Sequence, residues 1–194
     1  MSSIRERDFA DAPNRSGQTA RRALLERATV REVLMGAQDN ITNVLAVVLG
    51  VTIGAGRADL VALAGTAAAV AEAISMGGVL YTSTRAERDL DARDALAGSP
   101  APGGSRLGPG GAAVVTGLAA LAGGMVPLAP FAVLPVGPAM VASLAISILA
   151  LFALGSATAT ITRRTWWRDG LRLVAIGGTA ALAAALVGSL LRID

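Results

Sequence analysis

Five long apolar stretches, separated by short polar ones, dominate the pattern of hydrophobic and polar positions along the chain. They cover residues 33–53, 60–82, 112–134, 138–162 and 171–191. Each stretch is long enough to cross a bilayer as a helix, which takes about 20 residues at a rise of about 1.5 Å each. The pattern predicts an all-α integral membrane protein with five transmembrane helices.

The amino-acid composition agrees with this prediction and excludes most enzyme chemistry. Hydrophobic residues make up 53% of the chain and charged residues only 16%, against about 25% charged residues in a typical soluble domain. Cysteine and histidine are both absent. The chain therefore has no disulfide, no thiolate or imidazole metal ligand and no Ser-His or Cys-His catalytic pair. We expect a protein that is not an enzyme.

The distribution of arginine predicts how the chain is oriented in the membrane. All 17 basic residues are arginines, and fifteen of them lie before the first span or in the second and fourth connections, while Arg57 and Arg192 lie on the other side. The positive-inside rule then predicts a cytoplasmic N-terminus. Arginines in three juxtamembrane segments face anionic lipid, so the basic charge predicts no nucleic-acid partner. A composition rich in Ala, Gly and Arg favours a bacterial cell membrane.

The polar segments complete the predicted domain organisation. Residues 1–30 are predicted to form a cytoplasmic N-terminal segment, and residues 31–191 the transmembrane domain. The cytoplasmic loop 84–111 begins with a charged helical piece and ends in a linker rich in Gly and Pro. In the first span, Gly50 and Gly54 form a GxxxG motif, which indicates either close helix packing or a dimer face.

Two carboxylates lie well inside predicted spans, among 14 acidic residues in all: Asp39 and Glu72. A carboxylate inside a bilayer costs about 2.5–3.5 kcal/mol on insertion scales, so its presence needs compensation. Met76 follows Glu72 by four residues, and Met35, Asp39 and Asn43 recur at the same helical spacing, so each set shares one helix face.

Counting residues along the first two spans brings these groups to one region of the membrane. Asp39 and Met76 come out about 9 Å from the cytoplasmic ends of their helices, and Glu72 about 15 Å. Carboxylate and amide oxygens accept divalent cations, and a thioether favours softer transition metals. The pattern predicts a metal site formed by Asp39, Glu72, Met76, Asn43 and Met35. In the alternative interpretation, Asp39 caps or bridges water near the interface and Met76 only packs.

Three stretches resemble the vacuolar iron transporter family, in its bacterial or nodulin-like members. They are "REVLMGAQDNITNVLAVVLG", "EAISMGGVLYTS" and "GGMVPLAPF", in the first, second and third spans. The resemblance implies a homodimer that exports Fe²⁺, Mn²⁺ or both from the cytoplasm in exchange for protons. It also implies that Asp39, Glu72 and Met76 are the metal and proton groups, with the metal as transported cargo and no cofactor.

The sequence departs from the family pattern at three places. Asn40 stands where the family has a glycine, and Leu80 stands where the family has an acidic residue near the cytoplasmic mouth. The glutamate-rich cytoplasmic domain of plant-type members is shortened to loop 84–111. These departures leave two functional hypotheses open, a divalent-metal exporter and a non-transporting member that binds metal or acts as a scaffold.

Overall fold

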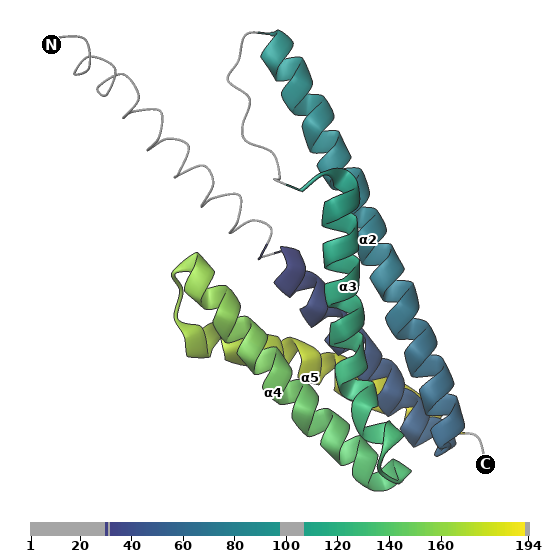
Figure 1. The fold of residues 1–194 in the computed structure, drawn as a ribbon. Coiled ribbons are helices and arrows are strands. Elements are labelled where there is room, and N and C mark those ends of the chain that lie inside the picture. The colour runs from purple at the N-terminus through teal and green to yellow at the C-terminus, as the bar shows by residue number, and fades with distance from the viewer. Residues whose placement is uncertain (1–29, 31, 98–106, 193–194) are drawn as a thin grey trace, which may run out of the picture.

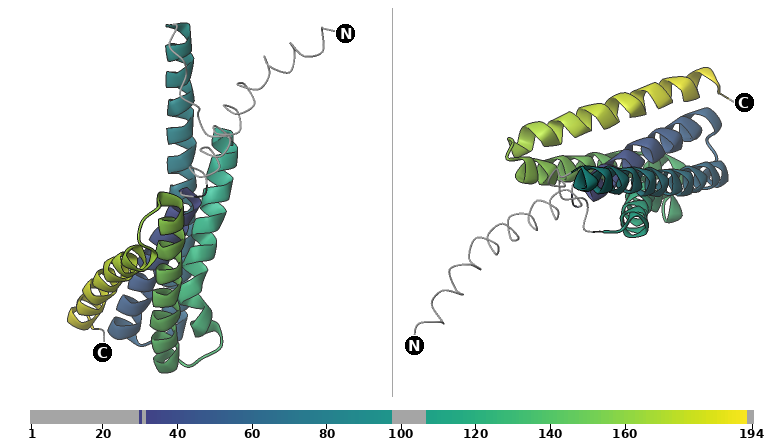
Figure 2. Two further views of the ribbon diagram at one scale, coloured as in Figure 1. Left: turned by 90° about the vertical axis from the view of Figure 1, so that its left-hand side faces the viewer. Right: turned by 90° about the horizontal axis from the view of Figure 1, so that it is seen from above.

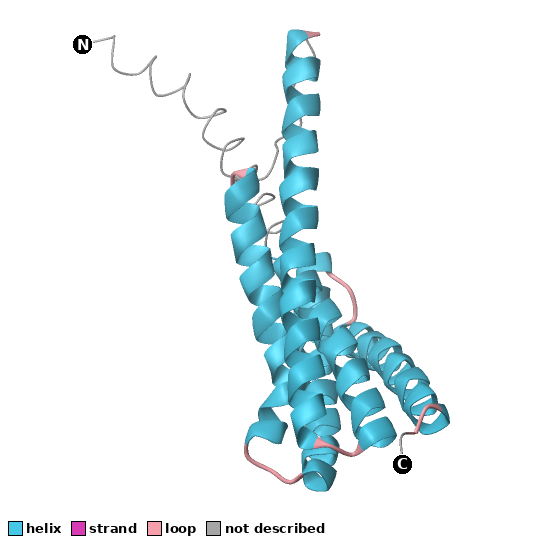
Figure 3. Ribbon diagram, turned by 90° about the vertical axis from the view of Figure 1, so that its right-hand side faces the viewer, coloured by secondary structure: helices cyan, strands magenta, loops and turns pink. Residues whose placement is uncertain are grey.

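The computed structural model describes residues 30, 32–97 and 107–192. These residues contain five helices that are long and apolar enough to cross a membrane. They are the first helix Glu32–Ala55, α2 Ala58–Leu96, α3 Pro109–Leu128 with the 3₁₀ turn η1 Ala129–Ala132, α4 Val136–Thr162 and α5 Trp166–Leu190 (Figure 1). The described residues contain no strand (Figure 3). The predicted all-α fold with five transmembrane helices is confirmed.

The first helix lies at the centre of the bundle, between α5 on one side and the α2–α3 pair on the other (Figure 2). Val44 and Val48 of the first helix are fully buried with Val61 and Ala69 of α2 and Leu128 of α3. Its Leu45 and Leu49 pack with Ala181 of α5. A small apolar core on two faces of the first helix therefore holds the bundle together.

Helix α2 is much longer than the span predicted at 60–82. Its 39 residues correspond to about 58 Å, about twice the thickness of the hydrocarbon core. The charged piece at the start of loop 84–111 contains no Gly or Pro up to Leu96, so it continues the helix without a break. The end of α2 projects beyond the other helices (Figure 1). Residues 98–106, which form most of the predicted Gly/Pro-rich linker, and residues 1–29 of the predicted N-terminal segment lie outside the described residues. The last residues of the predicted loop, 109–111, instead form the first turn of α3, which begins at Pro109.

Prolines shape the end of the third span. Pro127 is accommodated inside α3, where the Ser143 hydroxyl of α4 donates a 2.7 Å hydrogen bond to its carbonyl oxygen. The chain then tightens into η1, which contains Pro130, and Pro135 precedes the first turn of α4. Since proline lacks a backbone donor, this sequence ends one helix and starts the next within a few residues.

The GxxxG motif of the first helix packs within the chain. A Cβ built on Gly188 of α5 would lie 2.4 Å from the carbonyl oxygen of Gly50, and one on Gly54 would lie 3.2 Å from the carbonyl oxygen of Gly188. Only glycines allow two helix backbones to approach this closely. The structure thus agrees with the first interpretation of the motif, close helix packing, which occurs between the first helix and α5.

Candidate metal site

A two-residue connection places the first helix against α2. Gly56, with φ of +64°, and Arg57 are the only residues between the two helices, so these must run antiparallel as neighbours. Arg57 forms an ion pair with Asp59 in the first turn of α2. A positive φ suits a glycine, which explains the residue type at position 56. The short connection fixes which residues of the two helices face each other.

Asp39 of the first helix and Glu72 of α2 meet in this arrangement. The Glu72 carboxyl is close enough to the Asp39 carboxyl and the Asn43 amide to interact with both. Asn40, the residue after Asp39, donates a hydrogen bond to the carbonyl oxygen of Ala69, which lies about one turn from Glu72 on α2. The structure therefore brings together three of the five residues that the sequence pattern grouped.

Met76 lies about one helical turn from the carboxyl pair. A Cβ built on Gly36 would lie 3.7 Å from the Met76 methyl group, which places this methionine beside the first helix before Asp39. Asp39 is thus level with Glu72, whereas residue counting had placed it level with Met76. The register of the two helices is set at the Gly56–Arg57 connection, which counting from the cytoplasmic ends does not use.

The site opens sideways from the bundle. Asp39, Asn43 and Met35 are exposed on one face of the first helix, with Met35 51% exposed, and Glu72 and Met76 are half-buried beside them. In a bilayer this face would meet lipid unless something covers it. Within the described ranges no group of three or more Asp, Glu, His or Cys residues comes together. The further possible ligands beside the two carboxyls are therefore the Asn43 amide and, one turn away, the Met76 thioether.

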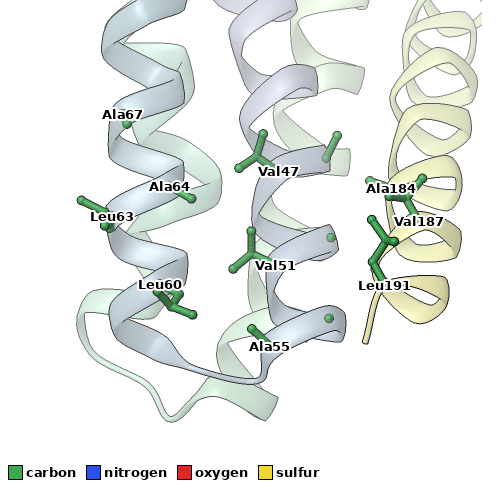
Figure 4. Close-up of a pocket in the computed structure, with 14 residues that line it drawn as sticks. Val47, Val51, Ala55, Leu60, Leu63, Ala64, Ala67, Ala184, Val187 and Leu191 are labelled. Atoms are coloured by element: carbon green, nitrogen blue, oxygen red, sulfur yellow. The ribbon is translucent and has the colours of Figure 1, made fainter. Parts of the chain in front are cut away.

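An apolar groove continues from the site toward the opposite end of the molecule. It has a volume of about 700 Å³, with the first helix as its floor and α2 and α5 as its walls (Figure 4). Val47 and Val51 of the first helix, Leu63 of α2 and Val187 of α5 are among its apolar lining residues. Because Val47 lies one turn beyond Asn43, the carboxyl pair and the groove share one exposed face of the bundle.

Asn40 has a structural role that sequence reasoning missed. Its side chain is fully buried, and Nδ2 donates hydrogen bonds of 3.1 Å to the Ala69 carbonyl of α2 and 2.7 Å to the Ala120 carbonyl of α3. A Cβ on Gly124 would lie 2.8 Å from this nitrogen, so that glycine makes room for the amide. Asn40 ties three helices together next to Asp39. The sequence signal was a polar residue in an apolar span, about 100° around the helix from the stripe formed by Met35, Asp39 and Asn43.

Leu80, the position where the family pattern has an acidic residue, is 9% exposed. It lies two turns beyond Glu72 on the same helix, which is about 12 Å along the axis. The neighbouring Val79, by contrast, is 54% exposed. A carboxylate at position 80 would be buried in an apolar interface, so the residue type matches its surroundings.

Five apolar helices with a carboxyl pair at membrane depth define an integral membrane protein with a polar intramembrane site. The family model described as the VIT family matches residues 30–96 and 91–189. The chain belongs to this family, which is one of membrane metal-ion transporters. The resemblance noted in the sequence is thereby confirmed. A comparison with curated proteins finds no match.

Proposed function

We propose that this protein exports a divalent transition metal, Fe²⁺ or Mn²⁺, from the cytoplasm of a bacterial cell in exchange for protons. The observation that supports the proposal most strongly is that the Asp39 and Glu72 carboxyls lie close enough to interact, on two helices that are candidate membrane spans. Two adjacent carboxylates repel each other strongly in a low dielectric unless a cation or a proton neutralises them. Such a pair is suited to exchanging one for the other.

The ligand set favours a loosely held transition metal. The Asp39 and Glu72 oxygens and the Asn43 carbonyl are hard ligands, which would accept many divalent cations. The Met76 thioether, one turn away, would favour Fe²⁺ or Mn²⁺ over Ca²⁺ or Mg²⁺ as the ion moves along the first helix. Without imidazole or thiolate ligands the ion would be released readily, which suits transport rather than storage.

Proton exchange would follow from the same two carboxyls. Metal binding requires deprotonated carboxylates, and loss of the metal leaves an unneutralised pair that takes up a proton. Each carboxyl would therefore alternate between a metal-bound and a protonated state. The fifteen arginines on one side of the spans support the cytoplasmic position of the N-terminus.

A homodimer would cover the exposed site. Asp39, Asn43 and Met35 lie on a face that continues into the apolar groove, and an ionisable side chain at membrane depth normally faces protein or a water-filled cavity. A second copy seated on this face would bring a second Asp39–Glu72 pair to the first one. Four carboxyls around one path would hold a cation better than the pair in a single chain.

The test is metal entry into proteoliposomes with the internal pH recorded in parallel. We expect flux of Fe²⁺ or Mn²⁺ coupled to proton movement, and its loss in Asp39→Asn and Glu72→Gln. Glu87→Gln is the matched control, because Glu87 is an exposed carboxylate on the projecting part of the same helix. Metal flux that survives Glu72→Gln with an unchanged pH dependence would disprove the exchange mechanism.

The second candidate is a non-transporting member of the family that binds metal or acts as a scaffold. The buried Leu80 in place of an acidic residue favours it, since a capture group near the cytoplasmic mouth is absent from this position. Metal binding to folded, reconstituted protein without any flux would support this alternative over the exporter.

A further inference from the structure

A recess lined by arginines lies at the turn between α4 and α5. It has a volume of about 350 Å³, and its lining residues are Arg164, Thr165, Arg168, Asp169 and Arg172. Three arginines and one aspartate thus line a space that would hold a phosphate group and several waters, since a water occupies about 30 Å³ of liquid. We refer to these five residues as the arginine recess.

The arginines of this recess are available for a ligand. In the part of the chain that the structure describes, the only salt bridge joins Arg57 and Asp59, at the opposite end of the helices. Arg168 lies 5.2 Å from the centre of the Trp167 ring, which holds its guanidinium in place without neutralising it. A planar guanidinium with its fork of donors matches the oxygens of a phosphate group.

The surroundings of the recess point to a phosphate carried by a lipid. Trp166, Trp167 and Leu171 are 57%, 44% and 52% exposed beside it. Tryptophans concentrate at the level of the lipid headgroups, and exposed aliphatic side chains on a membrane helix contact acyl chains. The recess and its rim therefore offer a cationic pocket and an apolar surface side by side, as an amphiphile with an anionic head requires.

We propose that the arginine recess binds the phosphate of an anionic phospholipid from the leaflet on that side of the membrane. The guanidiniums of Arg164, Arg168 and Arg172 would hold the phosphate oxygens, and Asp169 would accept hydrogen bonds from headgroup hydroxyls. The proposal is independent of metal transport, because none of these residues belongs to the carboxyl pair.

The two tryptophans of the chain provide a direct measurement, because both lie at this turn. In phosphatidylcholine vesicles, lipids with brominated chains quench tryptophan fluorescence when they lie next to it. We expect brominated phosphatidylglycerol to associate with these tryptophans about 5-fold more strongly than brominated phosphatidylcholine at low salt. High salt should reduce the preference through screening.

A matched pair of triple variants separates a specific site from general attraction. In R164Q/R168Q/R172Q, the ratio of phosphatidylglycerol to phosphatidylcholine association should fall close to 1. R85Q/R88Q/R93Q removes the same charge from the projecting part of α2, and this variant should retain the wild-type ratio. If the first variant fails to fold, the single variants R168Q and R172Q should each lower the preference about 2-fold. R164K/R168K/R172K should retain most of it.

Three outcomes would overturn the proposal. The wild type could show no preference for the anionic lipid, or both triple variants could lower it equally, which would indicate attraction without a site. Inorganic phosphate, added at constant ionic strength, could abolish the preference, which would assign the recess to a soluble anion instead. The lipid site is supported if only R164Q/R168Q/R172Q loses the preference for phosphatidylglycerol and inorganic phosphate does not compete.

Discussion

Asn40 of the first helix donates a 2.7 Å hydrogen bond to the carbonyl oxygen of Ala120 on α3, from a side chain that is completely buried. The neighbouring residue, Asp39, points to the exposed face of the same helix. Two consecutive polar residues at membrane depth thus have different environments. One holds the bundle together, and the other belongs to the candidate metal site.

Asn40→Ala should destabilise the protein. It removes two hydrogen bonds between helices and leaves a small cavity beside Gly124, so we expect the free energy of unfolding to fall by about 1–2 kcal/mol. Thr179→Ala is the control, because that exposed hydroxyl donates only to the Ile176 carbonyl of its own helix and should change stability little. Unfolding titrations in mixed micelles with sodium dodecyl sulfate measure both values. Equal stability of the two variants would show that the buried amide contributes nothing.

Gly188→Ala and Gly178→Ala should have opposite effects, although both glycines lie on α5. A Cβ at position 188 would lie 2.4 Å from the Gly50 carbonyl oxygen, and one at position 178 meets nothing within 4 Å. We expect the first variant to lose about 1–3 kcal/mol through overpacking. The second should be unchanged or gain up to about 1 kcal/mol from helix propensity. The same unfolding titration compares them, and a stable Gly188→Ala would refute the close packing of the two helices.

Leu80→Glu should not create a useful metal-capture group. Because Leu80 is buried, the new carboxyl would lose its hydration, and we expect a loss of about 3 kcal/mol or more in stability. Leu90→Glu introduces the same carboxyl at a position that is 57% exposed on the projecting part of α2, and it should cost less than about 1 kcal/mol. Expression level and elution as a single species give a first readout. A well-folded Leu80→Glu variant with increased metal flux would contradict this prediction.

Val47→Cys should form a disulfide between two copies if the groove faces a partner. The natural chain has no cysteine, so each single-cysteine variant reports on one position only. Val47 lines the groove beyond Asn43, whereas Leu149, 68% exposed on α4, lies elsewhere. Oxidation in membranes should give a covalent dimer for Val47→Cys and a monomer for Leu149→Cys. The reverse pattern would move the dimer interface to α4 and leave the carboxyl pair uncovered.

Much of this protein follows from its sequence alone. The helices were predictable because a chain in lipid must satisfy its backbone hydrogen bonds internally, so an apolar run of about 20 residues has few alternatives to a helix. Asp39 and Glu72 stood out for a similar reason, since a carboxylate in such a run is costly and needs a function. The continuation of α2 to Leu96 was visible only in part, as a charged helical piece.

The tertiary structure decided which residues meet. The pairing of Asp39 with Glu72, instead of Met76, depends on the register of two helices, which a two-residue connection sets and which residue counting misjudged by about a turn. Packing also separated Asn40 from Asp39, directed Gly50 toward Gly188, and gathered three arginines around one recess. Composition and spacing determine whether a segment enters the membrane, but contacts between helices depend on shape, and shape complementarity cannot be calculated one span at a time.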